Sequence, residues 1–358
     1  MARPCVKDFG FEALRARLAG EGAPRWRADQ VAGWLYGRGV DDFQAMTDLD
    51  HGLRARLAEG FDARALEVDS VRTSADGTAK AVLRARDGAL VESVAIPEGA
   101  RTTLCISTQV GCPLACAFCA TGAMGFTRNL GLGEIVDQVC QVRRLLPPER
   151  RITNVVFMGM GEPLLNLPAV VEAARLLVHP KAFAMAPSRV TVSTVGIPGR
   201  IERLLREVPV NLALSLHATT DDVRDRLVPL NRRFPLDRLL GTLRGLAGPR
   251  GLLTRRRPVF FEYTLVAGVN DGVEDARRLA PLLRGIPAKL NVIPMNRHAD
   301  SSLGPPDAAR IDRFVAEVAA SGLRVTLRRS RGPDIDAACG QLALRRAGEP
   351  ACGEAAGA

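Results

Sequence analysis

The sequence predicts an α/β protein built on a partial (βα)6 barrel, preceded by an N-terminal helical module and a small β-meander. From Thr102 onward, strand-like apolar runs alternate six times with helical runs, which is typical of parallel βα units. Residues 67–100 instead alternate with period two, and residues 9–66 have helical spacing. Six units are too few for a closed eight-stranded barrel, so we expect an open one.

The N-terminal module is expected to contain four helices within a domain of residues 1–66. An amphipathic helix covers 9–18, and a second opens at 23–25 and ends near the glycines at 37 and 39. Two shorter helices follow near 41–43 and 49–57. Their arginines suit contact with a phosphate backbone, but an ordinary amphipathic packing module explains them equally well.

The meander, residues 67–100, is expected to have strands near 66–71, 79–86 and 89–96, separated by Asp-Gly turns. It leads into a core domain of residues 101–346, followed by a flexible tail at 347–358. The meander and the C-terminal segment are the candidates for covering the barrel mouth. The expected core strands are 102–107, 152–158, 189–194, 210–216, 258–266, 289–294 and, after the last helix, 323–328. The expected helices are near 131–146, 168–178, 197–207, 235–248, 272–284 and 306–321.

Composition limits the class of protein. With 47% hydrophobic and 25% charged residues, the 358-residue chain has the balance of a soluble globular protein. No apolar run approaches the roughly 20 residues that span a bilayer, and we expect a cytoplasmic protein without a membrane partner. The net charge of +10 favours a polyanionic partner, whereas 4% aromatic residues argue against a broad base-stacking surface.

A cysteine-rich loop dominates the chemistry. Cys112, Cys116 and Cys119 are spaced C-x3-C-x2-C between glycines, where several thiolates can converge. Three thiolates from one loop suit a 4Fe-4S cluster whose fourth iron stays open, the arrangement of enzymes that bind S-adenosylmethionine (SAM) there. The alternatives are a zinc site with a ligand from elsewhere, or unligated buried cysteines.

Polar motifs also follow other predicted strands. In βα barrels, residues at the carboxyl ends of strands share one face. Such positions here are occupied by the Met158–Pro163 stretch, the Ser193–Gly196 stretch, the Ser215–His217 stretch and the Pro294–Asn296 stretch. Each motif is weak by itself, but together with the cysteine loop they indicate one site at the barrel rim.

At these positions the chain resembles the RlmN-type dual-specificity RNA methyltransferases, which are radical SAM enzymes. The matching stretches are 109–122, 125–130, 158–163, 214–218 and 334–342. The last stretch, Asp-Ile-Asp-Ala-Ala-Cys-Gly-Gln-Leu, is the most specific, since radical SAM enzymes in general lack it. Pro333, where the family pattern leads us to expect Asp, and the unmatched residues 297–302 are departures that concern substrate fit.

The resemblance implies roles for matching residues. One 4Fe-4S cluster would be bound by Cys112, Cys116 and Cys119. SAM, used twice per turnover, would be bound by Gly161, Glu162, Ser193, Ser215, Leu216, His217 and Asn296. The catalytic residues would be Cys339 as methyl carrier, Cys105 as its partner thiol in a disulfide, and Glu92 as proton acceptor. The implied partners are 23S rRNA, tRNA and an electron donor such as flavodoxin, and we expect a monomer.

The use of two cysteines has a chemical reason. Carbon-2 of adenine is not acidic enough for direct methylation by SAM, whereas a thiolate such as Cys339 accepts a methyl group readily. A radical formed from a second SAM then activates that methyl for addition to the ring. Because the protein becomes attached to RNA, a base must remove the ring proton and a second thiol, Cys105, must release the product.

Three other functions remain open at this point. The same cysteine pair would serve methylation of adenine at carbon-8, and a radical SAM enzyme could act on protein or small molecules. A zinc-dependent RNA-binding module without catalysis is the third. The basic residues Arg324, Arg328, Arg329 and Arg331 precede Cys339, and beside such a loop they favour contact with RNA phosphates.

Overall fold

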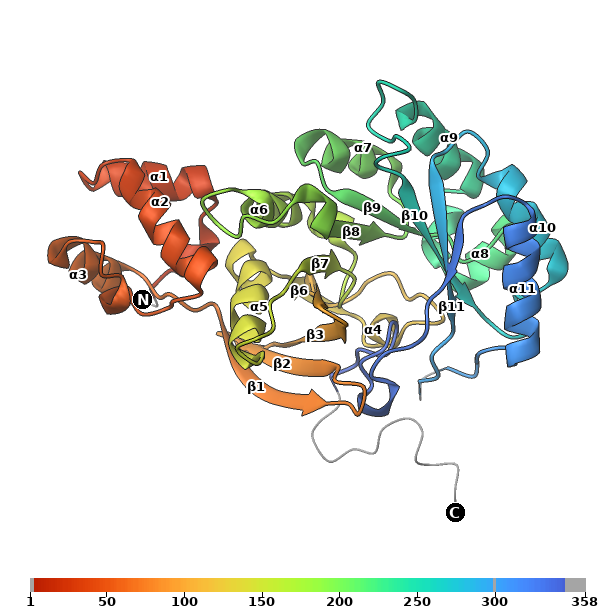
Figure 1. The fold of residues 1–358 in the computed structure, drawn as a ribbon, viewed down its shortest axis with the longest axis horizontal. Coiled ribbons are helices and arrows are strands. Elements are labelled where there is room, and N and C mark those ends of the chain that lie inside the picture. The colour runs from red at the N-terminus through yellow and green to blue at the C-terminus, as the bar shows by residue number, and fades with distance from the viewer. Residues whose placement is uncertain (1–2, 299–300, 345–358) are drawn as a thin grey trace, which may run out of the picture.

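The computed structural model describes residues 3–298 and 301–344. The predicted fold class is confirmed: parallel strands and helices alternate in an open barrel, with a helical lobe and a meander before it (Figure 1). One ten-stranded sheet runs in the order β1-β2-β3-β4-β7-β8-β9-β10-β11-β12, so β1 and β12 are its edges. None of the helices in the described ranges is both long and apolar enough to cross a membrane.

The core follows the six predicted βα units. Its parallel strands are β4 (Arg101–Cys105), β7 (Asn154–Phe157), β8 (Val190–Thr194), β9 (Asn211–Ser215), β10 (Val259–Leu265) and β11 (Ala288–Pro294). The covering helices are α5 (Leu132–Leu145), α6 (Leu167–Val178), α7 (Pro198–Glu207), α9 (Leu236–Leu246), α10 (Val273–Leu282) and α11 (Ala308–Ala320). The additional strand β12 (Val325–Leu327) pairs in parallel with β11.

The meander consists of β1 (Leu66–Thr73), β2 (Ala79–Ala85) and β3 (Leu90–Glu98). It extends the main sheet, because β3 pairs antiparallel with β4. The register sets Lys80 opposite Val94 and Val94 opposite Cys105. Residues directly opposite one another share a face of the sheet, and so do alternate residues of one strand. Lys80, Cys105 and Glu92 therefore lie on the same face.

The N-terminal lobe contains the expected helices (Figure 1). They are η1 (Val6–Asp8), α1 (Phe11–Gly20), α2 (Trp26–Ala32) continued by the π-turn η2 (Gly33–Arg38), η3 (Phe43–Ala45) and α3 (His51–Gly60). A fully buried ion pair, Lys7–Asp137, joins this lobe to α5. The other carboxylate oxygen of Asp137 accepts hydrogen bonds from the backbone of Ala65 and Leu66. The lobe is thus fixed to the barrel by a charged contact inside the core.

Several short elements were not predicted. They are the hairpin of β5 (Gln109–Gly111) and β6 (Phe126–Asn129), the helices α4 (Ala120–Ala123) and α8 (Asp221–Leu227), and the turns η4 (Pro163–Asn166), η5 (Pro187–Arg189), η6 (Pro229–Arg232) and η7 (Pro333–Ile335). Most lie between a strand end and the following helix, at the rim where the polar motifs gather.

Candidate active site

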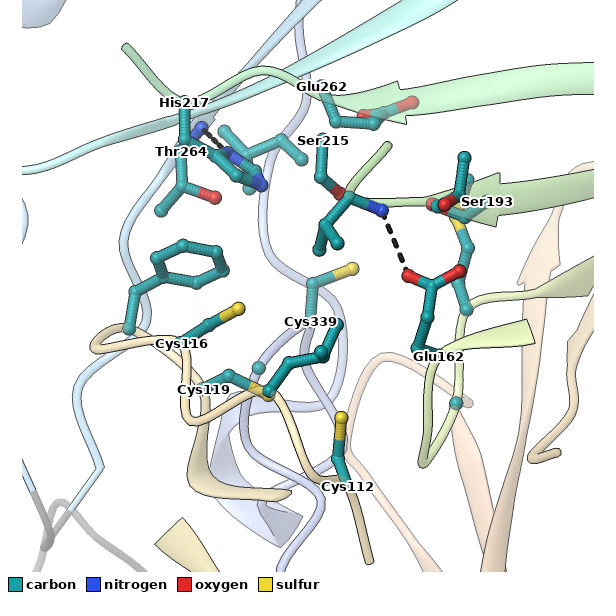
Figure 2. A pocket seen from close by; sticks show the side chains of 18 of the residues that line it. Cys112, Cys116, Cys119, Glu162, Ser193, Ser215, His217, Glu262, Thr264 and Cys339 are labelled. Carbon is teal, nitrogen blue, oxygen red and sulfur yellow. Dashed lines mark hydrogen bonds between the residues drawn. The ribbon is translucent and has the colours of Figure 1, made fainter. Parts of the chain in front are cut away.

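A cavity lies at the carboxyl ends of the barrel strands, and we call it the cofactor cavity (Figure 2). It contains about 950 Å³ of space, part of which is continuous with open solvent. Of the residues predicted to bind the cluster or SAM, all but Leu216 line it. They are Cys112, Cys116, Cys119, Gly161, Glu162, Ser193, Ser215, His217 and Asn296, together with the predicted methyl carrier Cys339. The expectation of one shared rim is therefore correct.

The cysteine loop is held by the β5–β6 hairpin. Gly111 has a φ of 73°, and a Cβ placed on it would lie 1.9 Å from the carbonyl oxygen of Gly125. The next residue, Cys112, donates its backbone N–H to that same oxygen at 2.7 Å. Only glycine tolerates both the positive φ and this close approach. Gly111 therefore lets the hairpin close directly beneath the first thiol.

The three thiols fit an iron–sulfur cluster by donor type. Burial raises the pKa of Cys112 to about 12 and also raises the pKa values of Cys116 and Cys119. Without metal the thiols are therefore protonated, and a bound metal would displace those protons. Among the described residues, no three His, Cys, Asp or Glu side chains already converge on one point. The fit rests on three thiols of one loop that face a common cavity (Figure 2).

Glu162 provides a carboxylate on the wall opposite the cysteine loop. Its Oε1 accepts from the backbone N–H of Leu164 at 2.9 Å. Its Oε2 accepts from the backbone N–H of Val195, also at 2.9 Å (Figure 2). Burial raises its pKa, and the two backbone hydrogen bonds partly oppose that shift. The neighbouring Gly161 has a φ of 99° and packs against Gln109. This wall presents a fixed hydrogen-bond acceptor, which suits a ligand's ammonium group.

His217 is the second ordered polar group. Its Nδ1 accepts the backbone N–H of Thr264 at 2.9 Å (Figure 2), which fixes the ring as a neutral imidazole with its proton on Nε2. Burial, and then the charge of Arg224, lower its pKa to about 3. The ring lies 4.4 Å from that of Phe118 on the cysteine loop, measured between centroids. His217 therefore offers a neutral donor at the cavity wall.

Leu216 contributes through its backbone position. Its side chain is fully buried, and its N–H donates to the carbonyl oxygen of Glu262 on β10 at 3.0 Å. It fixes the end of β9, so that Ser215 before it and His217 after it both face the cavity. The structure thus places Leu216 between two lining residues without making its side chain one of them.

Cys339 lies on a segment, residues 331–344, that we call the carrier loop. The loop is bound to the cysteine loop, because the backbone N–H of Ala120 donates to the carbonyl oxygen of Gly340 at 2.7 Å. The hydroxyl of Thr121 donates to the carbonyl oxygen of Leu342 at 2.6 Å. Pro333 is the first residue of η7, a position that needs no N–H. The proline is therefore compatible with this backbone.

A second, smaller cavity adjoins the first, and we call it the thiol cavity. Cys105 and Cys339 both line it, and Cys339 also lines the cofactor cavity. Burial, and then the negative charge of the Cys339 thiolate, raise the pKa of Cys105 to about 12. Cys339 is the exposed member of the pair, and Arg328 lines the same cavity. The two predicted catalytic thiols are thus brought together.

Glu92 does not line either cavity. It is fully buried in β3 beneath the carrier loop, where its Oε1 lies 2.9 Å from the Nζ of Lys80. Its Oε2 accepts a long hydrogen bond, 3.4 Å, from the backbone N–H of Leu344. Glu92 and Cys105 share a sheet face, so the third catalytic candidate belongs to the same region but is covered by the loop.

Two cavity residues were missed by the sequence reasoning. Glu262 on β10 is buried, and its pKa is raised by that burial. It accepts from Asn291 at 2.8 Å and forms an ion pair with Arg328 at 3.7 Å. A lone carboxylate in the apolar run Val-Phe-Phe-Glu-Tyr was the available signal. Arg328 was considered only as part of a basic run, yet it lines both cavities.

Comparison with known proteins is consistent with this geometry. The Radical SAM superfamily model matches residues 106–280, and the model of the ribosomal RNA large subunit methyltransferase N-terminal domain matches residues 6–62. A protein of Geobacter sulfurreducens, named dual-specificity RNA methyltransferase RlmN, is 47% identical, with 94% of this chain and 91% of the relative covered. A protein of Halorhodospira halophila with the same name is 47% identical, with 90% and 88% covered.

A solved structure shares the whole architecture. The crystal structure of a radical SAM methyltransferase from Sphaerobacter thermophilus superposes with a TM-score of 0.89 at 44% sequence identity. The match covers 95% of this chain and 99% of that one, so it includes the helical lobe, the meander and the barrel.

Proposed function

We propose that this chain, a member of the RlmN family of dual-specificity RNA methyltransferases, methylates carbon-2 of adenine in 23S rRNA and in tRNA. The family belongs to the radical SAM superfamily. Family membership makes the chain a SAM-dependent RNA methyltransferase with a 4Fe-4S cluster. Cys112, Cys116 and Cys119 would hold the cluster, and Glu162, Ser193, Ser215, His217 and Asn296, with the backbone at Gly161 and Leu216, would hold SAM. When bound, these groups supply the methyl group, an electron and a radical.

One observation carries the proposal: Cys339 lies in the wall between two cavities. Cys339 lines the cofactor cavity, where the SAM-binding residues lie, and it also lines the thiol cavity together with Cys105. Cys339 accepts a methyl group in the first and presents it to the adenine in the second. Glu92 accepts the ring proton. The Cys105 thiolate then attacks the sulfur of Cys339: an S–S bond forms, the bond between that sulfur and the product's methylene carbon breaks, and the carbon takes up a proton to complete the methyl group. Two SAM molecules are consumed in each turnover.

The basic rim of the thiol cavity supports an RNA substrate. Arg328, Arg329 and Arg331 all line it. Arg328 and Arg331 have carboxylate partners at 3.7 and 4.0 Å. Arg329 is exposed and makes no ion pair with any described residue. A cation there is available to a phosphate next to an adenine that has been extruded into the cavity.

We propose the domain roles, location and electron donor as follows. Residues 1–66 form an RNA-contacting accessory domain, 67–100 the meander, and 101–346 the catalytic core with its carrier loop; the expected tail, 347–358, lies outside the described residues. The enzyme works as a cytoplasmic monomer and receives electrons from a flavodoxin-like donor.

The test is to identify the methylated isomer. Reconstituted enzyme, SAM and a reductant are incubated with unmodified 23S rRNA or tRNA, which is then digested and analysed by mass spectrometry. We expect 2-methyladenine from both RNAs and none with Cys339→Ala. 8-Methyladenine would establish the alternative activity at carbon-8. Iron-free, zinc-loaded protein that binds RNA without modifying it would overturn the radical mechanism altogether.

A further inference from the structure

A buried ion pair lies beneath the carrier loop and contacts it on both sides of Cys339. The Nζ of Lys80 lies 2.9 Å from Glu92 Oε1 and donates a hydrogen bond to the carbonyl oxygen of Asp336 at 3.1 Å. Glu92 Oε2 accepts from the backbone N–H of Leu344. Lys80 is 2% exposed and Glu92 is 0% exposed. The pair therefore holds the loop three residues before and five residues after the methyl carrier.

The sheet explains how this pair is formed. Lys80 lies opposite Val94, and Glu92 is two residues earlier on β3, so the two charged side chains are diagonal neighbours on one face. Cys105 lies opposite Val94 on β4, on that same face. One ammonium thus contacts the predicted proton acceptor and the loop that carries the methyl group, on the sheet face that also bears the predicted resolving thiol.

Stabilisation of the fold alone is a weak explanation for this lysine. Desolvation of two buried charges offsets most of their attraction, so an apolar pair would stabilise the same position at least as well. A buried carboxylate without its cation, however, favours the protonated form, which cannot accept a proton. The ammonium is the nearby charge that compensates Glu92.

We propose that Lys80 is a positioning residue for the second half of the reaction, in which the ring proton is removed and the protein–RNA adduct is resolved. Its ammonium compensates the buried charge of Glu92, and its hydrogen bond to the carbonyl oxygen of Asp336 ties the carrier loop to this ion pair. After the methyl-derived radical has added to carbon-2, the proton on carbon-2 passes to Glu92 and the electron pair of the carbon–hydrogen bond stays with the ring. The unpaired electron left by the addition would return to the oxidised cluster, and Lys80 keeps its own proton. This inference rests on the proposed function, in which Glu92 is the acceptor.

The first half of the reaction does not need Lys80. Cys339 is held independently by Asn296, which donates to its carbonyl oxygen at 3.0 Å, and by the bond from Ala120 to Gly340. Methyl transfer to the thiol takes place on the cofactor side, away from the ion pair. Loss of Lys80 should therefore separate the two halves of the reaction.

The test compares Lys80→Met, Lys80→Arg and the control Lys7→Met. Lys7 is also a buried lysine paired with a buried aspartate, but it joins the helical lobe to α5, far along the chain from the carrier loop. Each variant is first checked by thermal unfolding. Mass spectrometry then measures methylation of Cys339, and denaturing gels follow the protein–RNA adduct through a single turnover.

For Lys80→Met we expect Cys339 methylation within about twofold of wild type and adduct resolution slowed about tenfold or more. Lys80→Arg, which keeps the charge and hydrogen-bond donors, should recover most of that rate. Lys7→Met should lose stability and resolve its adduct at the wild-type rate. Hydrogen exchange of residues 336–344 should rise in Lys80→Met and not in Lys7→Met.

Two outcomes would overturn the inference. The first is wild-type resolution and exchange in Lys80→Met, and the second is equal slowing in Lys80→Met and Lys7→Met. If Lys80→Met does not fold, Lys80→Arg alone is compared with wild type. A Lys80→Arg variant that is as stable as wild type but resolves its adduct as slowly as expected for loss of the lysine would also reject the inference. Failure of the proposed function looks different, because wild type itself would then form no RNA adduct.

Discussion

The side-chain amide of Asn296 donates a hydrogen bond to the carbonyl oxygen of Cys339, at 3.0 Å. Asn296 follows β11 and lines the cofactor cavity, and its side-chain oxygen Oδ1 accepts from the hydroxyl of Ser330. A residue that family resemblance assigns to SAM thus also holds the backbone of Cys339, the proposed methyl carrier. The cofactor site and the carrier loop are therefore ordered by one shared contact.

Removing any one cluster thiol should abolish cleavage of SAM. Cys112→Ala, Cys116→Ala and Cys119→Ala each remove a ligand that a three-thiolate site cannot replace. Iron and sulfide content and 5′-deoxyadenosine production measure the loss, and circular dichroism should show that the barrel persists. Cys140→Ala, which removes a buried thiol of α5, should retain its iron. A triple variant that still makes 5′-deoxyadenosine would refute the assignment.

The two catalytic thiols should fail at different steps. Cys339→Ala has no thiol to accept the methyl group, so it should form no adduct with RNA. Cys105→Ala should be methylated on Cys339 and attack the ring, then stall as a covalent protein–RNA species because no second thiol displaces the product. Both lose turnover, yet only Cys105→Ala should migrate with RNA on a denaturing gel. An adduct with Cys339→Ala, or with neither, means that the roles are wrong.

Gly111→Ala should damage the cluster site through geometry alone. The new Cβ would lie 1.9 Å from the carbonyl oxygen of Gly125, so the β5–β6 hairpin must open. Gly88→Ala is the matched control, since Gly88 has a φ of 83° and open space around it. Both variants have the roughly 1 kcal/mol cost of a positive φ. Only Gly111→Ala should lose iron, and its free energy of unfolding, measured with urea, should fall by more than this roughly 1 kcal/mol. Equal iron contents in the two variants would contradict this prediction.

His217 should make the ligand-free protein less stable in mild acid. Its pKa is about 3 in the folded chain and about 6.5 when unfolded, so between these values only the unfolded chain binds the proton. Stability is therefore lost as the pH falls below about 6.5, by about 1 kcal/mol from this group between pH 7 and pH 5.5. Urea unfolding at both values measures it.

His217→Gln is the variant that isolates this effect, because its amide oxygen can still accept from Thr264 but does not titrate. It should remove that part of the pH dependence, whereas the exposed His51→Gln should leave it unchanged. An identical pH dependence in His217→Gln and wild type would show that the imidazole is not buried as a neutral group.

RNA affinity should fall steeply with salt. Each phosphate contact contributes a log–log slope of roughly −0.7 to −0.9 through release of counterions. Arg329→Gln should weaken binding and reduce the slope by about one contact. Arg277→Gln, which removes an arginine already paired with Glu274 and Glu317 on α10 and α11, should leave the slope unchanged. Salt-independent binding, or equal slopes for both variants, would exclude the rim of the thiol cavity as an RNA contact.

Periodicity was sufficient for the long elements of the core. The apolar run predicted as a strand over 258–266 is β10, Val259–Leu265, and the helix predicted over 306–321 is α11, Ala308–Ala320. Long amphipathic segments are predictable because apolar residues recur at regular intervals on one face over many residues. The β5–β6 hairpin was missed because strands of three and four residues contain too few alternations to be recognised.

The site shows the same division. The residues that line the cofactor cavity follow strand ends, so their meeting could be predicted from topology. Lys80 could not be found this way, because it looks like any polar residue of an alternating strand. Its role depends on a contact with Asp336, 256 residues away in the chain. Burial of Glu92 beneath the carrier loop depends on the same long-range packing.

The continuity of the sheet from β1 to β12 has a mechanical consequence. The strands β2 and β3 beneath the carrier loop and the strands whose ends surround the cofactor cavity belong to one continuous sheet. They therefore do not close on each other like two hinged domains. Transport of the methyl group is then limited to the reach of one cysteine side chain and its short loop. For such an enzyme, solvent viscosity should slow the arrival and departure of RNA and leave the passage between cavities unaffected.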